Sequence, residues 1–592
     1  MEFDLFGERR SGHWVNGAKF AKLIGYTAGE NRYGRLMCLV YHPHLSGVKN
    51  QIMIRVILKA FLLMTLTVAA GLSNVTHAQQ STTALTGEWV GNSEPPGRSE
   101  LVRLSLTEDA GEIRIPLSRF NQKLSLVRRE GSQVRFELST LKLVMTGTIT
   151  GDEIDGEAEV PGTKARFHLV RTAKVAPEIL ANYVGAYRFR NGEYFVIDRF
   201  AYIPDILHVI DVKSGEVRAM FPRSDTQFTS GPALYVASPT RRTITFRGAR
   251  THVVDLDHKG RQSGAYATRI PIRQEEVSFK NGDVTLAGTL VVPEAKAKRR
   301  PAIVFTHGGG PQLREVFWGL GYLFAARGFV VLSYDKRGVG KSTGNWGEAS
   351  FEDLADDAVA AAKFLQARTD IAANQIGFWG LSQGGWIAPL AASRFPDAAF
   401  AIALSGGGLS PAVQELFDSE YELSKAGFTA NEVKDALAFQ RLKNDIIASQ
   451  DKWEEYAKLR LTAKDAKWFR QQGIDVRGPE KRDDPFWTHM RRFYVYDPGP
   501  TLRASKAPLL AIFGELDTPE GVKANVRAIT QILDQAGRRD YIVKVYPSAV
   551  HNLMEAPRDN SNEYVRLKRF PPGLFDTMVD WTTTQLRRRA GQ

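Results

Sequence analysis

Cysteine is almost absent from this sequence. Cys38 is the single cysteine among 592 residues, so no intramolecular disulfide can form. A disulfide framework is therefore excluded, and hydrophobic cores alone must stabilise the domains. A chain with so few thiols suits an oxidising compartment, where stray thiols are a hazard.

The chain also lacks a convincing membrane-spanning segment. The apolar run 60–72 is shorter than the roughly 20 residues that cross a bilayer, which argues against a permanent anchor. Arg55 and Lys59 precede this run, and Thr76-His77-Ala78 places small residues at cleavage-type positions. The arrangement predicts a secretory signal peptide over 53–78. The alternative is a buried N-terminal helix.

The predicted signal begins unusually late in the chain. Signal peptides lie at the extreme N-terminus, so we expect Met53 to be the initiator and 1–52 to be an upstream extension. Cleavage before Gln79 leaves no cysteine there to carry a lipid. We therefore expect a periplasmic or secreted protein without a stable membrane anchor.

Acidic residues are outnumbered by basic ones. The formal net charge is +13 and the pI is near 9.5, which could indicate a polyanionic partner. The basic residues are scattered, however, and the C-terminal Arg587-Arg588-Arg589 run is short. No nucleic-acid-binding motif is present. We expect no nucleic acid partner, and nothing in the sequence indicates the oligomeric state.

Two β-rich segments come first after the signal. Alternating apolar and polar residues, broken by turn signals, predict hairpin-linked strands over 79–172 and again over 173–270. We expect two small barrels or sandwiches. Together they are too short for a β-propeller, whose blades take about 40 residues each.

From about residue 271 the pattern changes to alternating strands and helices. Ser350 and Asp353 predict a capping-box start for one amphipathic helix. Six apolar runs predict buried parallel strands: 302–305, 329–332, 376–379, 400–404, 509–513 and 541–545. The fold class is therefore α/β, with a catalytic domain over 271–592.

An insertion at about 409–500 is rich in helix formers and aromatic residues. We expect a helical cap that roofs the active site and excludes water. Each aromatic side chain more often packs in the core of such a cap than contacts substrate. The aromatic residues in question are Trp453, Tyr456, Trp468, Phe469, Trp487, Phe493 and Tyr494.

A sharp turn carries the candidate nucleophile. Gly380-Leu381-Ser382-Gln383-Gly384 follows an apolar strand and precedes a helix-like segment. A serine on such a strand-turn-helix element is held in a strained conformation with its hydroxyl exposed. Because a serine hydroxyl is a poor nucleophile at neutral pH, it needs a base and donors for the developing oxyanion.

The base and its acid follow later strands. His551 comes after the last predicted strand, whereas His489 falls within the cap, so we expect His551 to be the base. Asp517 follows the strand before it and is expected to orient His551, with Glu515 as a structural neighbour.

Glycine backbone follows the first parallel strand. His307-Gly308-Gly309-Gly310-Pro311 is an HGGG-type loop, so we expect the oxyanion hole to comprise the N–H groups of Gln383 and of Gly309 or a neighbour in this loop. His307 itself is expected to be a structural hydrogen-bonding residue.

A second loop, 334–342, ends in Gly340-Lys341-Ser342 and superficially resembles a phosphate-binding loop. The spacing fails because Asp335 stands where the first glycine is required. We expect Asp335 to pair with Arg337 and to organise this turn instead.

Together these motifs resemble the α/β-hydrolase superfamily and, more narrowly, EstD-type serine esterases. The residues that carry the resemblance are His307-Gly308-Gly309-Gly310-Pro311, 334–344, 380–385, Asp517 and His551, in the chain order serine, acid, histidine. The resemblance covers 276–592. It implies a mostly parallel sheet with helices on both faces and a helical cap. The two small β-rich domains that we expect before this sheet are not covered by the resemblance. It also implies a carboxylic ester hydrolase with no metal or organic cofactor.

We therefore expect a serine hydrolase that cleaves small-molecule carboxylic esters through a Ser382, His551 and Asp517 triad and an acyl-enzyme intermediate. A serine peptidase, similar to an aminopeptidase or a prolyl oligopeptidase, is the alternative because the same triad cleaves amides. A third possibility is a non-catalytic envelope or carbohydrate binder that uses the β-rich domains.

Overall fold

The computed structural model describes residues 84–590 apart from 96–98, 119, 200–202, 204, 249, 257–261, 472–476 and 557–563. The predicted extension 1–52 and signal peptide 53–78 lie outside the described residues. None of the described helices is both long and apolar enough to cross a membrane.

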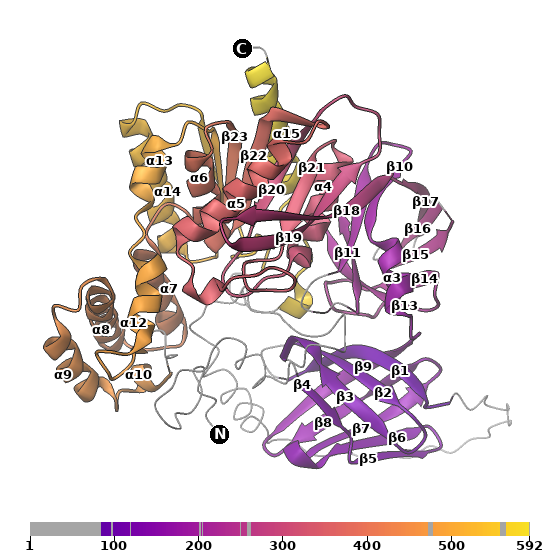
Figure 1. The fold of residues 1–592 in the computed structure, drawn as a ribbon. Helices are drawn as coiled ribbons and strands as arrows, with labels where there is room; N and C mark the ends of the chain where they lie inside the picture. The colour runs from indigo at the N-terminus through magenta and orange to yellow at the C-terminus, as the bar shows by residue number, and fades with distance from the viewer. Residues whose placement is uncertain are drawn as a thin grey trace. The chain divides into compact units, whose positions relative to one another are not determined.

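The chain divides into two compact units (Figure 1). One unit holds Pro271–Arg558 and Pro571–Gln592, and we call it the hydrolase unit. The other, the β-rich unit, runs up to Ile270 and includes Asp559–Phe570. The sequence predicts one catalytic domain over 271–592, whereas residues 559–570 group with the β-rich unit.

The β-rich unit begins with an antiparallel sheet of nine described strands, in the order β4-β3-β2-β1-β9-β8-β7-β6-β5. Alternating side chains such as Leu104, Phe136 and Leu169 form a buried core on one face. The strands are β1 (Gly87–Glu94), β2 (Glu100–Leu106), β3 (Gly111–Ile115), β4 (Phe120–Lys123), β5 (Leu126–Glu130), β6 (Gln133–Leu138), β7 (Leu143–Thr150), β8 (Glu153–Val160) and β9 (Thr163–Thr172).

A closed barrel follows the short helix α3 (Pro177–Tyr183). Neighbouring strands pair antiparallel, and β17 closes the ring by pairing with β10. The strands are β10 (Gly185–Phe189), β11 (Tyr194–Arg199), β12 (Leu207–Asp211), β13 (Val217–Pro222), β14 (Gln227–Ser230), β15 (Arg242–Arg247), β16 (Arg250–Leu256) and β17 (Gln262–Arg269). Closure leaves the barrel without unpaired edge strands.

A segment from near the C-terminus adds to the hydrogen bonding of this unit. The backbone N–H of Val217 donates to the carbonyl of Lys568 over 3.0 Å, and that of Leu234 donates to Leu567 over 2.7 Å. The segment Asp559–Phe570 is therefore a structural part of the β-rich unit, although it follows the whole sheet of the hydrolase unit in the sequence.

The hydrolase unit contains a sheet whose described strands have the order β18-β19-β21-β20-β22-β23-β24-β25. The hairpin β18–β19 pairs antiparallel, β19 is antiparallel to β21, and the remaining pairs are parallel. The strands are β18 (Ile272–Asn281), β19 (Val284–Pro293), β20 (Arg300–Thr306), β21 (Val330–Tyr334), β22 (Ile371–Leu381), β23 (Ala398–Leu404), β24 (Leu509–Gly514) and β25 (Tyr541–Tyr546). This is the predicted α/β-hydrolase fold.

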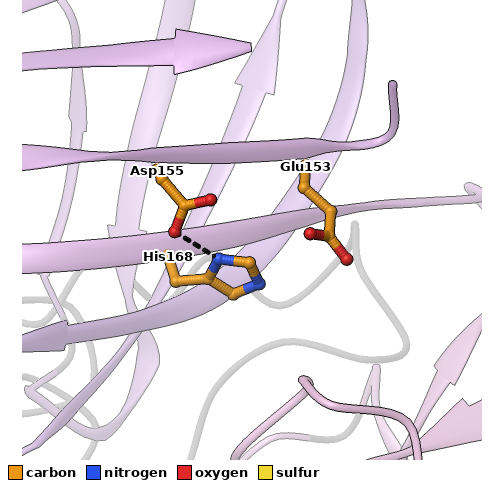
Figure 2. Close-up of side chains that lie close together, drawn as sticks. All are labelled: Glu153, Asp155 and His168. Atoms are coloured by element: carbon orange, nitrogen blue, oxygen red, sulfur yellow. Dashed lines mark hydrogen bonds and ion pairs between the residues drawn. The ribbon is translucent and has the colours of Figure 1, made fainter. Parts of the chain in front are cut away.

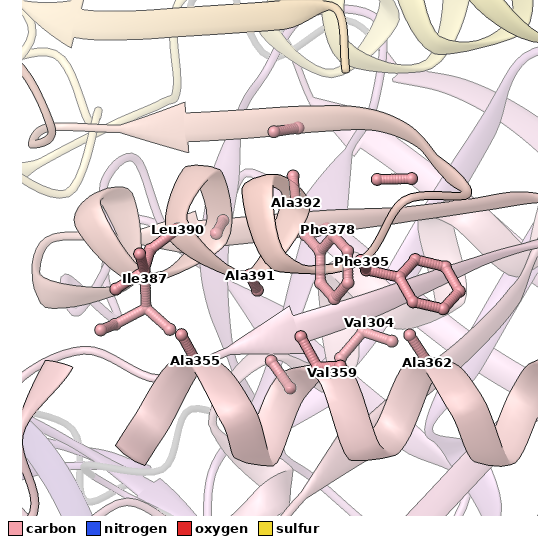
Figure 3. Close-up of a cluster of buried hydrophobic side chains, with 14 of the residues drawn as sticks. Val304, Ala355, Val359, Ala362, Phe378, Ile387, Leu390, Ala391, Ala392 and Phe395 are labelled. Atoms are coloured by element: carbon pink, nitrogen blue, oxygen red, sulfur yellow. The ribbon is translucent and has the colours of Figure 1, made fainter. Parts of the chain in front are cut away.

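Helices cover both faces of this sheet (Figure 1). On one face, α5 and α6 pack on Val304 and Phe378, as Figure 3 shows, and residues of α13 and α14 join the same core. On the other face, Phe324 of α4 packs on Phe305, and Trp581 of α15 packs on Phe400. The helices are α4 (Trp318–Ala326), α5 (Phe351–Gln366), α6 (Gln383–Arg394), α13 (Pro498–Ala504), α14 (Pro519–Gln535) and α15 (Leu574–Ala590).

The predicted start of α5 is confirmed. Ser350 caps the helix by accepting the N–H of Asp353, and the Asp353 carboxylate accepts the N–H of Ser350. This reciprocal bonding satisfies two donors that a helix N-terminus leaves free.

The insertion forms a helical cap after β23. Its aromatic side chains pack mainly on one another, as in the contacts of Tyr456 with Phe439 and Trp487, so their main role is the core of the cap. The described helices are α7 (Pro411–Lys425), α8 (Ala430–Ala448), α9 (Trp453–Ala463), α10 (Lys467–Gln471) and α12 (Pro485–Tyr494).

Candidate active site

Ser382 lies on a strained turn between β22 and α6. Its φ of 59° and ψ of −121° lie in a backbone region that non-glycine residues rarely adopt. The backbone holds this conformation because Ser382 N–H donates to Leu404 O over 2.9 Å, and Gly385 N–H donates to Ser382 O over 2.7 Å. The turn therefore has the geometry of a nucleophile elbow.

Gly380 is required by the tightness of this elbow. A Cβ atom at this position would lie 2.1 Å from the Gly384 carbonyl oxygen and 2.2 Å from Thr306 Oγ1. Both distances are far below van der Waals contact, so no larger residue fits without moving the turn. The spacing of glycine before and after the serine is thus explained by backbone crowding.

His551 and Asp517 are brought together at the ends of β25 and β24. The Nδ1 atom of His551 lies 2.8 Å from Oδ2 of Asp517, which is a hydrogen-bond distance. Asp517 is 8% exposed and His551 24% exposed, so the carboxylate is buried behind an accessible imidazole. Because Nδ1 is bonded to Asp517, Nε2 is the ring nitrogen that would accept a proton from a serine hydroxyl.

Strand β23 lies between the elbow and the histidine loop. Ser382 is bonded to the end of β23 at Leu404, as described above. The next residue, Ser405, donates its hydroxyl hydrogen bond to the His551 carbonyl over 2.8 Å. The serine and histidine loops are therefore both fixed to the carboxyl end of the same strand.

Glu515 takes a different place from Asp517. Its Oε2 atom accepts the N–H of Ser548 over 3.4 Å, within the loop that leads to His551. Backbone bonds from Glu515 to Tyr546 and from Leu516 to Ala549 join the two loops further. Glu515 thus shapes the loop, while Asp517 is the carboxylate that contacts the imidazole.

The expected oxyanion residues lie at the same edge of the sheet. Gln383 is the first residue of α6, and the N–H groups of a first helical turn have no acceptor within their own helix. Gly309 lies in the loop after β20, and a Cβ atom there would meet nothing within 4 Å. Both positions suit donors to an oxyanion, a role that we take up below.

Lys336 was missed as a site residue by the sequence analysis. Its side chain is 2% exposed, and its Nζ atom donates to Gly308 O, Gly310 O and Gln383 Oε1 over 2.9, 3.0 and 2.7 Å. The available signal was its position directly after a buried strand, in the loop 334–342. This residue contacts both segments that carry the expected oxyanion donors.

The predicted pairing of Asp335 with Arg337 is wrong. Asp335 instead forms a buried ion pair with Arg314, with Oδ2 and Nη2 2.7 Å apart. Arg337 pairs with Asp357 of α5, also over 2.7 Å. Neighbouring side chains leave this turn in different directions, so each finds a partner on another element.

His307 serves as a structural residue, as expected. Its Nε2 atom contacts the carbonyl oxygen of Tyr334 and its side chain is buried. Burial, followed by the positive charge of Lys336, lowers the pKa of His307 to about 3. The imidazole is therefore neutral at physiological pH.

The cap is connected to the acid loop. Thr518 donates to Oδ1 of Asp418 on α7 over 2.6 Å, and both side chains are buried. The cap also reaches the first residue of α5, since the ring centroids of Phe493 and Phe351 lie 6.3 Å apart. These contacts fix two sides of the cap to the sheet domain.

Two other features of the described residues include none of the candidate catalytic residues. A depression of about 510 Å³ lies between the β18–β19 turn and α5, and none of the candidate catalytic residues lines it. Glu153, Asp155 and His168 offer ligand atoms within 4.8 Å of one another on β8 and β9 (Figure 2). His168 Nδ1 is already bonded to Asp155 over 2.7 Å, and both carboxylates are exposed, so we assign no metal to this cluster.

Comparison with solved structures finds similar folds at low identity. A hypothetical protein of Pseudomonas aeruginosa is 18% identical, with a TM-score of 0.35, over 53% of this chain and 94% of that one. Acetyl xylan esterase 1 of a Thermoanaerobacterium species is 16% identical, with a TM-score of 0.31, over 54% and 89%. The esterase Pf2001 of Pyrococcus furiosus is 15% identical, with a TM-score of 0.31, over 53% and 93%.

Among curated proteins, a putative phosphoribosyl transferase of Mycobacterium tuberculosis is 30% identical over 126 residues, in each of two strains. The alignment covers 21% of this chain and spans 27% of the length of that relative. The narrower resemblance to EstD-type esterases is not supported specifically by any of these proteins.

A family comparison covers more of the chain. The model of the X-Pro dipeptidyl-peptidase (S15) family matches residues 216–537, which is more than half of the 592 residues. The match includes Gly309, Ser382 and Asp517 and ends before His551. The chain thus has the α/β-hydrolase fold and belongs to the X-Pro dipeptidyl-peptidase (S15) family.

Proposed function

We propose that this protein is a serine peptidase that releases short N-terminal peptides, with Ser382 as nucleophile, His551 as general base and Asp517 as the acid that orients it. The observation that carries the proposal is the match to the X-Pro dipeptidyl-peptidase family over a segment that includes Ser382 and Asp517. The match favours amide cleavage over the ester cleavage expected from the sequence.

The proposed reaction gives one role to each of the three side chains. Ser382 Oγ attacks the scissile carbonyl carbon while His551 Nε2 accepts its proton. The Asp517 bond to Nδ1 keeps the imidazole in the tautomer that can do so and then stabilises the imidazolium. The tetrahedral oxyanion is stabilised by the N–H groups of Gly309 and Gln383.

Collapse of the tetrahedral intermediate breaks the amide bond. His551 transfers its proton to the leaving amine, and Ser382 remains as an acyl ester. A water molecule then attacks the acyl carbon as His551 accepts its proton, and the second collapse regenerates the serine. Every step uses groups of this chain and water.

A second candidate is hydrolysis of carboxylic esters. The His307-Gly308-Gly309-Gly310 loop favours it, because HGGG-type loops form the oxyanion hole of lipases and esterases. An alkoxide leaves more readily than an unprotonated amide nitrogen, so the same site would cleave esters with less need for leaving-group protonation. A non-catalytic binder would not require the strained serine or the bonded His551–Asp517 pair.

Matched substrates separate these candidates. Ala-Pro-p-nitroanilide tests dipeptide release, Ala-p-nitroanilide tests aminopeptidase activity, and an N-blocked Ala-Pro anilide tests cleavage without a free amine. Short-chain p-nitrophenyl esters test the second candidate. We expect the highest kcat/KM among the three anilides for free Ala-Pro-p-nitroanilide, and clear turnover of that amide.

The control is Ser382→Ala, which should abolish every one of these activities while leaving the circular dichroism spectrum and melting temperature of the protein unchanged. Turnover of esters with no measurable amide cleavage would reject the peptidase in favour of the second candidate. Full activity of Ser382→Ala would reject both.

A further inference from the structure

Lys336 occupies an unusual place for a lysine. The residue follows β21 directly, and its side chain is among the largest that are fully buried in the described structure. Burying an ammonium group is costly unless its hydrogen bonds are satisfied. A lysine in such a position therefore needs a structural or functional reason.

The surroundings of the amine are fitted to an ammonium ion. Nζ lies 2.9 Å from Gly308 O, 3.0 Å from Gly310 O and 2.7 Å from Gln383 Oε1. An ammonium has three N–H donors and no acceptor, so three oxygen atoms take up its full donor capacity. The Trp346 ring, with its centroid 5.9 Å from Nζ, adds a weak cation–π contact.

The two acceptor segments are those that carry the expected oxyanion donors. Gly308 and Gly310 flank Gly309 in the loop after β20, and Gln383 directly follows the nucleophile. These segments lie 73 to 75 positions apart in the sequence and belong to different elements of the fold. Lys336 Nζ is a single atom that bonds to both.

The geometry of the peptide group between Gly308 and Gly309 determines where the Gly309 N–H points. In a trans peptide the carbonyl of Gly308 and the N–H of Gly309 belong to one plane and point to opposite sides. Fixing the Gly308 carbonyl on the ammonium therefore aims the Gly309 N–H away from it. The positive charge also polarises the same peptide group, which strengthens its N–H as a donor.

The cavity next to the Lys336 amine is too small to admit a substrate group. The cavity next to it has a volume of about 10 Å³ and is lined by His307, Tyr334, Lys336, Leu354, Asp357 and Ile387. A space of that size holds at most about one water molecule. We therefore look for the role of Lys336 in the groups that it holds, which are the Gly308 and Gly310 carbonyls and the Gln383 side chain.

We propose that Lys336 is the positioning residue of the oxyanion hole, where its ammonium group fixes the Gly308–Gly310 loop to Gln383 and aims the Gly309 N–H at the developing oxyanion. This inference rests on the proposed role of Ser382 as nucleophile, and it applies equally to amide and ester substrates. It also assigns a function to Gln383 beyond its backbone N–H, as an acceptor that keeps the two segments together.

The test is the rate at which an alkyl fluorophosphonate labels Ser382. This reagent needs a nucleophilic serine and places its phosphoryl oxygen in the oxyanion hole, so it reports on both without a known substrate. The proteins are the full chain and its variants Lys336→Met, Gln383→Met and the double variant. Mass spectrometry gives the labelled residue, the final stoichiometry and the second-order rate constant.

We expect Lys336→Met to lower the labelling rate constant by about 10- to 100-fold, somewhat less than the loss of an oxyanion donor itself. The final stoichiometry should remain that of the unmodified chain, and KM for a turned-over chromogenic substrate should change much less than kcat. Gln383→Met should lower the rate to a smaller extent. The double variant should lose less than the product of the two single effects, since both act through one contact.

Lys443→Met provides the matched control. Lys443 is a fully buried lysine of the cap, paired with Glu415 over 3.1 Å and remote in sequence from the loops that hold Lys336. Its replacement removes a buried ammonium and lowers the melting temperature, but it should leave the labelling rate of the folded protein unchanged.

The outcomes separate the two proposals. A wild-type chain that is not labelled at Ser382 overturns the proposed function and this inference together. A labelled wild type with an equal rate for folded Lys336→Met overturns the role of Lys336 alone. Should Lys336→Met fail to fold, Gln383→Met decides, because an undiminished rate in that variant contradicts the contact between the two segments.

Discussion

Thr518, the residue after Asp517, donates its hydroxyl hydrogen bond to Asp418 of the cap helix α7 over 2.6 Å. Gln414 on the same helix donates to the same carboxylate oxygen over 2.8 Å. Thr518 is 2% exposed and Asp418 7% exposed, so this contact is shielded from water. The position of the acid loop is therefore tied to the docking of the cap.

Replacing Thr518 with valine tests this connection. Thr518→Val removes the donor and leaves a buried carboxylate with fewer partners, so we expect the free energy of unfolding to fall by about 1–3 kcal/mol. Urea denaturation measures this loss. Thr518→Ser retains the hydroxyl and should stay close to wild type. If both variants unfold at the same urea concentration, the hydroxyl contributes nothing to the docking of the cap.

The two acidic residues near His551 should differ sharply in their effect on activity. Asp517→Asn keeps the size of the side chain but favours the wrong imidazole tautomer, and the corresponding change in other triads lowers kcat by about 10⁴-fold. Glu515→Gln retains an oxygen that can accept the Ser548 N–H, so most of the activity should remain. Steady-state kinetics on one substrate compares the two. An equal loss in both would contradict the assignment of Asp517.

The Arg314–Asp335 pair should be important for stability. The two side chains are 4% and 3% exposed, so Arg314→Met leaves a buried carboxylate without its main counter-charge. Breaking such a pair costs about 3–5 kcal/mol. Chemical denaturation measures the loss. The exposed pair of Lys523 with Glu520 is the control, and Lys523→Met should have little effect.

Acidification should destabilise the hydrolase unit through His307. The folded-state pKa of about 3 lies below the ordinary value of 6.5, chiefly because the imidazole is buried. Below about pH 6.5 the unfolded chain binds a proton that the folded chain does not. The stability that the neutral His307 side chain contributes is therefore fully present above pH 6.5, and it is lost as the pH falls toward 3. The expected slope is up to about 1.4 kcal/mol per pH unit.

His307→Asn should flatten this dependence, as measured by urea unfolding between about pH 7 and pH 4. His208, buried in the barrel, also has its pKa lowered to about 3 by burial. His208→Asn should instead change the pH dependence of the transition that reports on the β-rich unit. An unaltered slope in His307→Asn would show that other groups govern acid unfolding.

The parts of the fold that could be predicted depend on local signals. Six strands were visible as apolar runs, and five of them are buried, since both faces of a parallel sheet are covered. The prediction of a buried strand over 541–545 is wrong, because β25 lies at the edge of the sheet and leaves Ile542 and Val545 exposed. The capping box at Ser350 was visible because both partners lie within one helical turn. The elbow at Ser382 and the loops of Asp517 and His551 were visible because each directly follows a strand.

The parts that could not be predicted depend on contacts between distant segments. Asp335 pairs with Arg314 rather than with Arg337, because side chains two residues apart on this turn face different elements. Lys336 could not be distinguished from a solvated lysine until both of its acceptor segments were placed. Similarly, the hydrogen bonds of residues 565–568 to the β-rich unit have no counterpart in any local pattern.

Those late hydrogen bonds have a consequence for synthesis. Val217 and Leu234 obtain their backbone partners from Lys568 and Leu567, some 330 to 350 positions later in the chain. A ribosome therefore releases nearly the whole polypeptide before the β-rich unit can acquire its final strand-like neighbour. Cotranslational folding of that unit can therefore be completed only after residues 565–568 have been synthesised, although most of the unit precedes the hydrolase unit in the sequence.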